Sequence, residues 1–294
     1  MRVLVLGVSG MFGHAVHSVF ASDPQHETFG TLRSASARRF FPAGDGERLI
    51  DGVDVTDQDA MLDVMRRVRP DVVINAVGVV KQLAAANDPL VVLPINALLP
   101  HRLAKLCGVA GARLVHISTD CVFSGSAGNY SESDRSDAYD LYGKSKYIGE
   151  VHDQPHVLTL RTSGIGHELA SANGLLEWFL AQSGTARGFT QAIYSGLPWV
   201  ELARVIKDVV LPRPELQGLY HVSSRPIAKY DLLGLIAKAY DKDIVIQPDD
   251  SLRIDRSLDS TRFSQATGYT APEWPALIDA LAASHQTSFA SARV

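Results

Sequence analysis

Two side chains near the middle of the chain, Tyr142 and Lys146, have the types and spacing needed for proton transfer. They stand four residues apart in the run Tyr-Gly-Lys-Ser-Lys, so a helix would place them on one face, one turn apart. A tyrosine alone transfers protons poorly near neutrality, because its ordinary pKa is about 10. A neighbouring ammonium stabilises the phenolate and lowers that pKa. We therefore expect Tyr142 to act as an acid or base that Lys146 tunes.

Hydroxyl side chains stand upstream of this pair, at the end of an apolar run. Residues 113–118 are expected to form a buried strand, which Ser118 and Thr119 close. In a doubly wound sheet, the carboxyl ends of the strands border the ligand crevice. Ser118 or Thr119 is therefore expected to hydrogen-bond a substrate carbonyl beside Tyr142, and Ser118 is also a candidate cofactor contact. A Tyr–Lys pair that only packs on a helix surface is the alternative.

The N-terminal segment carries three glycines between an apolar run and a helical pattern. Gly7, Gly10 and Gly13 have the spacing GxxGxxG. Such glycines allow a tight turn, a close approach of the backbone to a pyrophosphate, and close packing of helix on strand. The helix N-terminus then offers free N–H groups and a favourable dipole to the anion. The pattern predicts dinucleotide binding, with a purely structural glycine turn as the alternative. Further candidate contacts within the turn are Ser9, Met11 and Phe12.

The end of the second expected strand decides between NAD and NADP. An NAD site has an acidic residue there, about 20 residues past the glycines, which accepts a hydrogen bond from the ribose 2′-hydroxyl. Here the strand ends in Thr31-Leu32-Arg33-Ser34, without an acid. Arg33 is expected to pair with a 2′-phosphate, assisted by Arg38 and Arg39, and Thr31 is a further candidate contact. NADPH is therefore the expected cofactor, and solvated surface arginines are the alternative.

Later segments are expected to complete the cofactor site at the same edge. Asp54 and Val55 follow an apolar stretch, and the Asp54 carboxylate is expected to hydrogen-bond the adenine amino group. The next strand closes with residues whose backbone groups are expected to line the cofactor. These residues are Asn75, Ala76, Val77 and Gly78.

Three further residues are candidates for contact with the substrate. Lys81 and Gln82 stand just past the strand that ends near residue 78, with surface placement as the alternative. Arg256 is able to clamp a diphosphate through bidentate hydrogen bonds. A surface ion pair with Asp255 or Asp259 is the alternative for Arg256.

Apolar runs and helical patterns alternate through the first half of the chain. Unbroken apolar runs suit strands that helices cover on both faces. The alternation predicts an α/β fold, a doubly wound parallel sheet of the Rossmann type with right-handed crossovers. The expected strands are 3–7, 27–33, 72–78, 113–118 and 157–161, and the expected helices are 11–21, 57–68, 96–108 and 140–152.

After residue 163 this rhythm changes. Segment 164–192 shows no clear strand, whereas a helix near 198–210 and a strand at 219–223 return to the earlier pattern. We therefore expect an NADP-binding domain of residues 1–163 plus 193–224. A smaller, interleaved C-terminal substrate-binding lobe, residues 164–192 plus 225–294, is expected to cap the carboxyl edge of the sheet.

Composition limits the classes of function. The chain has 294 residues, of which 46% are hydrophobic and 20% charged, with a formal net charge of −4. No basic block indicates a nucleic-acid partner, and no run approaches the roughly 18–20 apolar residues of a membrane helix. Cys107 and Cys121 are the only cysteines, so a disulfide framework is excluded and a reducing cytoplasm fits. Without a Cys/His cluster at ligand spacing, no metal site is expected.

Taken together, these motifs resemble the extended short-chain dehydrogenases/reductases, and within them the dTDP-4-dehydrorhamnose reductases and related nucleotide-sugar reductases. The resemblance implies Thr119, Tyr142 and Lys146 as the catalytic triad. It also implies NADPH-dependent reduction of the keto group of a nucleotide-linked 4-keto-6-deoxy sugar, as in deoxysugar and polysaccharide biosynthesis. The segments that carry it are GVSGMFG, DVTD, NAVG, Pro94-Ile95-Asn96, ISTDCVF, YGKSKYIGE, LRTS and GLYHVS. The cofactor contacts that it implies are Gly7, Gly10, Gly13, Arg33, Asp54 and Val55.

Two positions depart from that resemblance. Cys121 follows Thr119-Asp120, where the dehydratases of the superfamily have Glu and the reductases usually have Tyr. Because a thiol is a poor acid or base for water elimination, dehydration is disfavoured. Gly164 follows LRTS, where the reductases usually carry an aromatic residue that packs on the sugar. The departures leave the nucleotide and the sugar open.

Two other functions stay open. A nucleotide-sugar epimerase with tightly held NAD(P) would use the same groups without net loss of NADPH. A non-catalytic NADP-binding regulatory protein would keep the fold, although such proteins usually lose the Tyr or the Lys. The helices expected at 96–108 and 140–152 are candidates for pairing across a homodimer.

Overall fold

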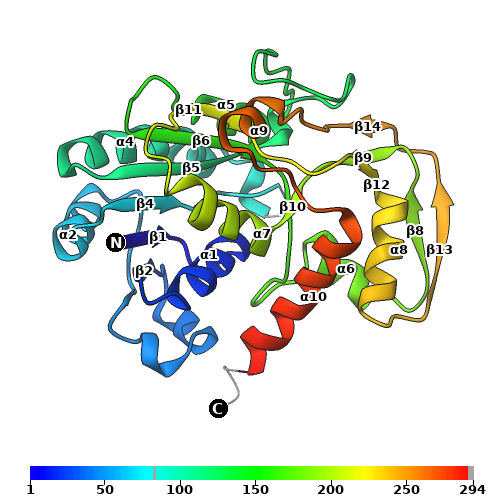
Figure 1. Ribbon diagram of the computed structural model, residues 1–294, viewed down its shortest axis with the longest axis horizontal. Helices are drawn as coiled ribbons and strands as arrows, with labels where there is room; N and C mark the ends of the chain where they lie inside the picture. The colour runs from blue at the N-terminus through cyan, green and yellow to red at the C-terminus, as the bar shows by residue number, and fades with distance from the viewer. Residues whose placement is uncertain (82–83, 291–294) are drawn as a thin grey trace.

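The computed structural model describes residues 1–81 and 84–290, with the backbone alone for residues 84 and 285–290. Its centre is a seven-stranded parallel sheet in the order β11-β6-β5-β4-β1-β2-β3 (Figure 1). The strand order reverses between β1 and β4, which places a topological switch point beside the first strand. The predicted doubly wound α/β fold is confirmed. The strands are β1 (Arg2–Leu6), β2 (Glu27–Thr31), β3 (Leu49–Ile50), β4 (Val72–Asn75), β5 (Arg113–Thr119), β6 (Val157–Thr162) and β11 (Gly218–His221).

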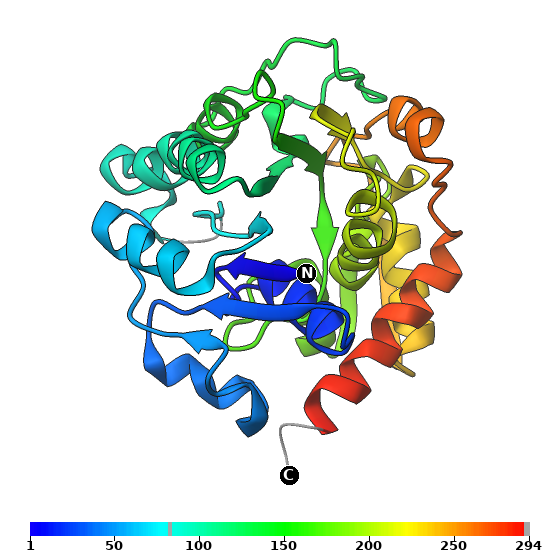
Figure 2. The same cartoon turned by 60° about the vertical axis from the view of Figure 1, so that its left-hand side comes forward.

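Helices cover both faces of this sheet (Figure 2). One face carries α1 (Met11–Ala21), α7 (Trp199–Arg204) and the π-helical turn η6 (Val205–Val210). The other carries α2 (Gln58–Val68) and α4 (Leu99–Ala110), and α5 (Leu141–Ile148) packs beside the π-helical turn η4 (Leu93–Leu98). Short 3-10 turns connect the elements at η1 (Ala35–Phe40), η2 (Ala43–Asp45), η3 (Ala84–Asn87) and η5 (Asp120–Val122).

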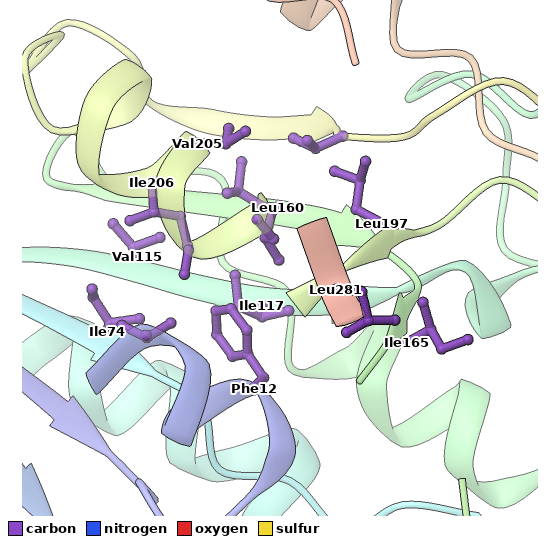
Figure 3. Close-up of a cluster of buried hydrophobic side chains, with 14 of the residues drawn as sticks. Phe12, Ile74, Val115, Ile117, Leu160, Ile165, Leu197, Val205, Ile206 and Leu281 are labelled. Atoms are coloured by element: carbon purple, nitrogen blue, oxygen red, sulfur yellow. The ribbon is translucent and has the colours of Figure 1, made fainter. Parts of the chain in front are cut away.

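The unbroken apolar runs of the sequence are explained by two separate cores. Because side chains alternate along a strand, Val3 and Val5 enter the core beneath α1, whereas Leu4 and Leu6 enter the core beneath α2 and α4. Figure 3 shows the first core, where Phe12 from the start of α1 lies with Ile117 of β5. A strand buried on both faces has no polar side to give an alternating pattern.

Beyond residue 163, the described part of the chain adds three small sheets and, besides α7, the helices α6, α8, α9 and α10. The prediction that segment 164–192 lacks strands is wrong, because β7 (Gly164–Ile165), β8 (Gly184–Phe189) and β9 (Ala192–Tyr194) lie there. The strand β8 reads GTARGF, without an apolar pattern, and is held by pairing with the distant β13 (Ile244–Asp249). The remaining elements are β10 (Leu197–Pro198), β12 (Ile227–Ala228), β14 (Ile254–Asp255), α6 (Leu175–Ala181), α8 (Lys229–Ala239), α9 (Thr261–Thr267) and α10 (Trp274–Ala290).

These elements gather mainly at one end of the molecule, as the ribbon shows on the side of α8 and β13 (Figure 1). The strand β9 pairs with both β12 and β14, and β10 pairs with β7. The division of the chain into an NADP-binding domain of 1–163 plus 193–224 and a substrate-binding lobe of 164–192 plus 225–294 stays a proposal.

One helical stretch is apolar enough to resemble a membrane span. The short helix α3 (Pro89–Val92), η4 and α4 run on from one another over Pro89–Ala110, with a window of mean hydropathy 1.3 that is 44% buried. Because Asn96, His101, Arg102 and Lys105 interrupt it, this stretch is not a continuous run of roughly 18–20 apolar residues, and it does not contradict the prediction. In the fold, Leu99, Leu103 and Cys107 of this stretch pack into the core beneath α4.

Candidate active site

The glycine turn between β1 and α1 is held in a tight conformation. Gly7 has a φ of 79°, and its N–H donates to the Thr31 hydroxyl at 3.1 Å. A Cβ on Gly13 would lie 2.2 Å from the carbonyl oxygen of Gly7, so only glycine lets α1 lie this close to the strand end. The helix begins at Met11 without a side-chain cap. Its first N–H groups are therefore free for an anion.

The residues of this turn that were predicted to contact the cofactor differ in how exposed their side chains are. Ser9 and Gly10 are exposed, whereas the Phe12 ring is buried in the core and leaves only its backbone to face a ligand (Figure 3). Thr31 is 2% exposed, and its hydroxyl accepts the Gly7 N–H. Thr31 thus holds the turn from beneath.

Among the arginines expected at the 2′-phosphate, Arg33 is exposed at the end of β2. Arg38 is occupied elsewhere, since its guanidinium donates to Asp51 at 2.9 Å and to the Leu49 carbonyl at 2.6 Å. Arg39 lies 4.6 Å from the ring centroid of Phe40. The expected help from Arg38 is therefore not supported, because an internal ion pair holds that side chain.

The residues expected at the adenine are held by local contacts, and those expected along the cofactor lie next to the glycine turn. Hydrogen bonds from the Thr56 side chain and backbone hold the pKa of Asp54 below its usual range, so its carboxylate stays charged; Val55 is half-buried beside it. Ala76 and Val77 lie next to the glycine turn, because a Cβ on Gly7 would come within 2.8 Å of Val77.

Asn75 and Gly78 are the first and last residues of the segment expected to line the cofactor. The Asn75 side chain is buried, with its amide nitrogen 3.1 Å from His116 Nδ1 and its oxygen accepting from the Val77 N–H. Asn75 therefore shapes the strand end through its side chain, and the exposed Gly78 follows at the edge.

The structure brings Thr119 and Tyr142 together at the carboxyl end of β5. The Thr119 hydroxyl donates to Asp120 at 3.1 Å and accepts from the Cys121 N–H at 3.1 Å. Burial raises the pKa of Tyr142, and a hydrogen bond with the Thr119 side chain works in the opposite direction. The phenol therefore holds its proton near neutrality, and a hydroxyl lies beside it.

Lys146 is placed differently from the expectation. Its side chain is buried, and its ammonium donates to the carbonyl of Ile117 at 2.7 Å. Burial lowers the pKa of Lys146 to about 8, with Glu150 working to raise it. The expected lowering of the Tyr142 pKa by Lys146 is not found, because burial dominates at the phenol.

The Ser118 hydroxyl is not available to hydrogen-bond a substrate or cofactor as expected. That hydroxyl donates to Glu150 at 2.6 Å, and the same carboxylate binds Arg161 through a buried ion pair. Sequence reasoning missed both Glu150 and Arg161. The signal that was available is spacing, because Glu150 follows Lys146 by four residues within the helix expected at 140–152, although α5 ends at Ile148.

Two of the three residues expected to bind substrate reach the surroundings of Tyr142. The Lys81 ammonium lies 5.6 Å from the Tyr142 ring centroid and 2.6 Å from the Asp140 carboxylate, which also caps α5. Arg256 donates to the Phe123 carbonyl at 2.8 Å. The third residue, Gln82, lies outside the described residues.

Trp199 explains the glycine found where a family aromatic was expected. A Cβ on Gly164 would lie 2.2 Å from the Trp199 ring, so the space that a side chain at this position needs is already filled. The same indole packs against Phe12 with ring centroids 5.2 Å apart. Trp199 therefore links the glycine turn to β7.

Both cysteines are expected to be unreactive in the folded protein. Burial raises the pKa of Cys107 and of Cys121 to about 12, so at pH 7 only about one thiol in 10⁵ is the reactive thiolate. Titration with a thiol-specific chromogenic disulfide should find no fast-reacting group at pH 7 and two thiols after unfolding. Rapid modification of Cys121 in the native protein would contradict this.

Comparison with known proteins now places the chain in a family. The family described as RmlD substrate binding domain matches residues 1–280. The chain belongs to this family. The predicted resemblance is thereby confirmed. Among the side chains of residues 1–81 and 85–284, no three His, Cys, Asp or Glu gather as metal ligands would.

The relatives with similar sequences include both an enzyme and a subunit of another enzyme. The chain is 31% identical over 182 residues to a dTDP-4-dehydrorhamnose reductase of Salmonella typhimurium, covering 58% of this chain and 59% of that protein. It is 30% identical over 149 residues to methionine adenosyltransferase 2 subunit beta of Pongo abelii, covering 51% and 41% respectively. These matches thus span about half the length of each relative.

A solved structure shows the fold over nearly the whole chain. The dTDP-4-dehydrorhamnose reductase of Bacillus anthracis, solved in complex with NADP, superposes with a TM-score of 0.77 at 21% identity. The match covers 95% of this chain and 98% of that one. At 21% sequence identity, this structural similarity establishes the fold of the chain and not its reaction.

Proposed function

We propose that this protein is an NADPH-dependent reductase of a nucleotide-activated 4-keto-6-deoxy sugar. The observation that carries the proposal is the meeting of Thr119 with Tyr142 at the edge of the sheet where α1 begins without a cap. Membership of the RmlD family and the relative named as a dTDP-4-dehydrorhamnose reductase support it.

The residues around the glycine turn fit NADPH. The free N–H groups at the start of α1 suit a pyrophosphate, and the close approach at Gly13 leaves them at the end of β1. Arg33 would pair with the 2′-phosphate, and Asp54 would accept from the adenine amino group. Ala76 to Gly78 would line the cofactor with their backbone. When bound, NADPH supplies the hydride for the substrate's carbonyl carbon.

The side chains of the chain handle the oxygen of that carbonyl. The Thr119 hydroxyl, which donates to Asp120 in the structure, would turn its proton toward that oxygen and fix its direction. As the C=O π bond opens, its electron pair moves onto the oxygen, which takes the phenolic proton of Tyr142. The raised pKa of Tyr142 suits this direction, because the phenol arrives protonated. The Lys146 ammonium is expected to supply positive charge beneath the site.

Charged side chains near Asp120 suit an anionic substrate. Burial raises the pKa of Asp120, and Arg256 works to lower it. Lys229, which begins α8 and which sequence reasoning missed, is also influenced by Asp120 and Arg256. Lys81, which pairs with Asp140 at 2.6 Å, lies near Tyr142. A sugar diphosphate would bind with its negative charge toward Lys81, Arg256 and Lys229.

The second candidate is a non-catalytic subunit of another enzyme. It is favoured by the relative named methionine adenosyltransferase 2 subunit beta. The presence of both Tyr142 and Lys146 favours the reductase. Pairing of two copies through 96–108 and 140–152 stays a proposal as well, supported by the exposed Leu98, Tyr147 and Ile148 on these helices.

The reductase is tested by the absorbance of NADPH with dTDP-, UDP- and GDP-linked 4-keto-6-deoxy sugars. Substrate-dependent loss of NADPH with one nucleotide is the expected result. Conversion of the sugar without net loss of NADPH would instead establish the epimerase. Tight NADPH binding with no conversion in the whole panel would favour the subunit.

Arg33→Ala is expected to weaken NADPH binding by about 10–100-fold, because a charge-assisted pair with the 2′-phosphate contributes about 1.5–3 kcal/mol. NADH has no such phosphate, so its affinity should not change. Titration of both cofactors by protein fluorescence measures the difference. Arg66→Ala is the matched control, because this arginine of α2 is exposed and pairs with Asp63. Equal losses for NADPH and NADH in Arg33→Ala would contradict the assignment.

A further inference from the structure

Two hydrogen bonds fasten the end of β5, one to α5 and one to Glu150, which follows that helix by two residues. The Lys146 ammonium donates to the Ile117 carbonyl at 2.7 Å, and the Ser118 hydroxyl donates to Glu150 at 2.6 Å. Ile117 and Ser118 directly precede Thr119, and Lys146 stands one helical turn after Tyr142. These bonds therefore set the position of the strand end that carries Thr119 against the helix that carries Tyr142.

Glu150 is anchored on its other side by Arg161 of β6. The guanidinium donates from Nε to Oε1 and from Nη2 to Oε2, each at 2.7 Å, and the two side chains are 1% and 3% exposed. Arg161 also lies over the Phe123 ring at 5.2 Å and 3.3 Å from His221 Nε2. A bidentate pair in this geometry fixes direction as well as distance, so Glu150 joins β5, β6 and α5 behind the site.

Glu150 is also the anion that acts on Lys146. Lys146 and His101 of α4 both act electrostatically on His116 of β5, and Tyr142 stands one helical turn before Lys146 on α5. Burial, followed by the charge of Lys146, lowers the pKa of His116 well below its usual range, so this imidazole is neutral. Burial likewise lowers the pKa of Lys146 to about 8, and Glu150 is the group that opposes it.

We propose that Glu150 is a positioning residue of this enzyme, which holds the strand end that carries Thr119 against α5 and places a carboxylate on the side of Lys146. The role in turnover rests on the proposed reductase activity. The effect on Lys146 does not, because it is a property of the folded chain alone.

Glu150→Gln keeps the shape of the side chain and an acceptor for Ser118, and it removes the charge. The pKa of Lys146 then falls below about 8. Because the charged form is the functional one, activity is lost as pH rises through that pKa, so the alkaline limb of kcat/KM moves to lower pH. The expected displacement is about one pH unit, a tenfold change in the protonation equilibrium.

Two measurements test this. Lysines are methylated with ¹³C-formaldehyde, and the Lys146 resonance, assigned with Lys146→Met, is titrated by NMR without cofactor. The midpoint should lie near 8 in the parent and about one unit lower in Glu150→Gln. The pH profile of kcat/KM is the second readout. Because Glu150→Gln leaves Arg161 unpaired, the double variant with Arg161→Gln is measured too, and it should show the same displacement.

Asp23→Asn is the matched control, since it removes the anion of another partly buried ion pair, to Lys207 at 3.0 Å, outside the site. It should lower Tm without moving the Lys146 midpoint. An unchanged Lys146 midpoint in both Glu150 variants would overturn the proposal, even if the protein proved to be no reductase. Absence of turnover with a displaced midpoint would overturn only the proposed function.

Discussion

Tyr142→Phe is expected to lower kcat by about 10²–10⁴-fold, the usual contribution of a positioned proton donor. The phenol is held beside the Thr119 hydroxyl with its pKa raised by burial. The substitution removes the proton that the carbonyl oxygen needs and leaves the ring in place. NADPH affinity should stay within a few-fold of the parent, because the pyrophosphate site at α1 is untouched. Steady-state kinetics with the active sugar nucleotide, together with a cofactor titration, measures both effects.

Tyr147→Phe provides the matched control on the same helix. Tyr147 is 44% exposed and one residue past Lys146, so the loss of its hydroxyl should leave kcat unchanged. Wild-type turnover in Tyr142→Phe with bound NADPH would falsify the assignment of Tyr142 as the proton donor. Equal losses in both variants would point to a structural effect on α5.

Gly13→Ala is expected to damage both folding and cofactor binding. Its Cβ would lie 2.2 Å from the Gly7 oxygen and 2.8 Å from the Gly7 carbonyl carbon, and both are backbone atoms that a rotamer change cannot relieve. Displacing α1 should lower the free energy of unfolding by about 1–3 kcal/mol. The same displacement moves the N–H groups that would hold the pyrophosphate. NADPH binding should therefore weaken by about 10–100-fold.

Gly234→Ala separates this clash from the general effect of replacing a helical glycine. Gly234 also lies within a helix, α8, but a Cβ there would meet nothing within 4 Å. Because alanine favours helix more than glycine does, this variant should be more stable by up to about 1 kcal/mol. Chemical denaturation and NADPH titration on both variants measure the contrast. A Gly13→Ala protein as stable as the parent would contradict the close packing of α1 on the turn.

The sheet could be predicted because its strands are buried on both faces. Val3 to Leu6 alternate between two cores, and the resulting unbroken apolar run is visible in the sequence. The strand β8 could not be predicted, since GTARGF has neither run nor alternation and depends on pairing with β13. Thr119 and Tyr142 could be predicted because the end of a parallel strand and the following helix share one edge of the sheet.

The partners of individual polar side chains could not be predicted in the same way. We expected the side chains of Thr31, Ser118 and Arg38 to contact ligands. In the structure they bind Gly7, Glu150 and Asp51, respectively. For Thr31 and Ser118, the partner comes from a segment that is distant in sequence. The residue type tells which hydrogen bonds a hydroxyl or a guanidinium is able to make. Which partner it binds depends on the groups that the tertiary structure places within hydrogen-bond distance.

Transfer of deuterium from NADPH labelled at C4 of the nicotinamide tests the central claim most directly. The product of the active sugar nucleotide is isolated and examined by NMR and mass spectrometry. The reductase predicts one deuterium on the carbon that bears the new hydroxyl, with one NADPH consumed for each product formed. A changed sugar without deuterium and without loss of NADPH would contradict it and would favour epimerisation.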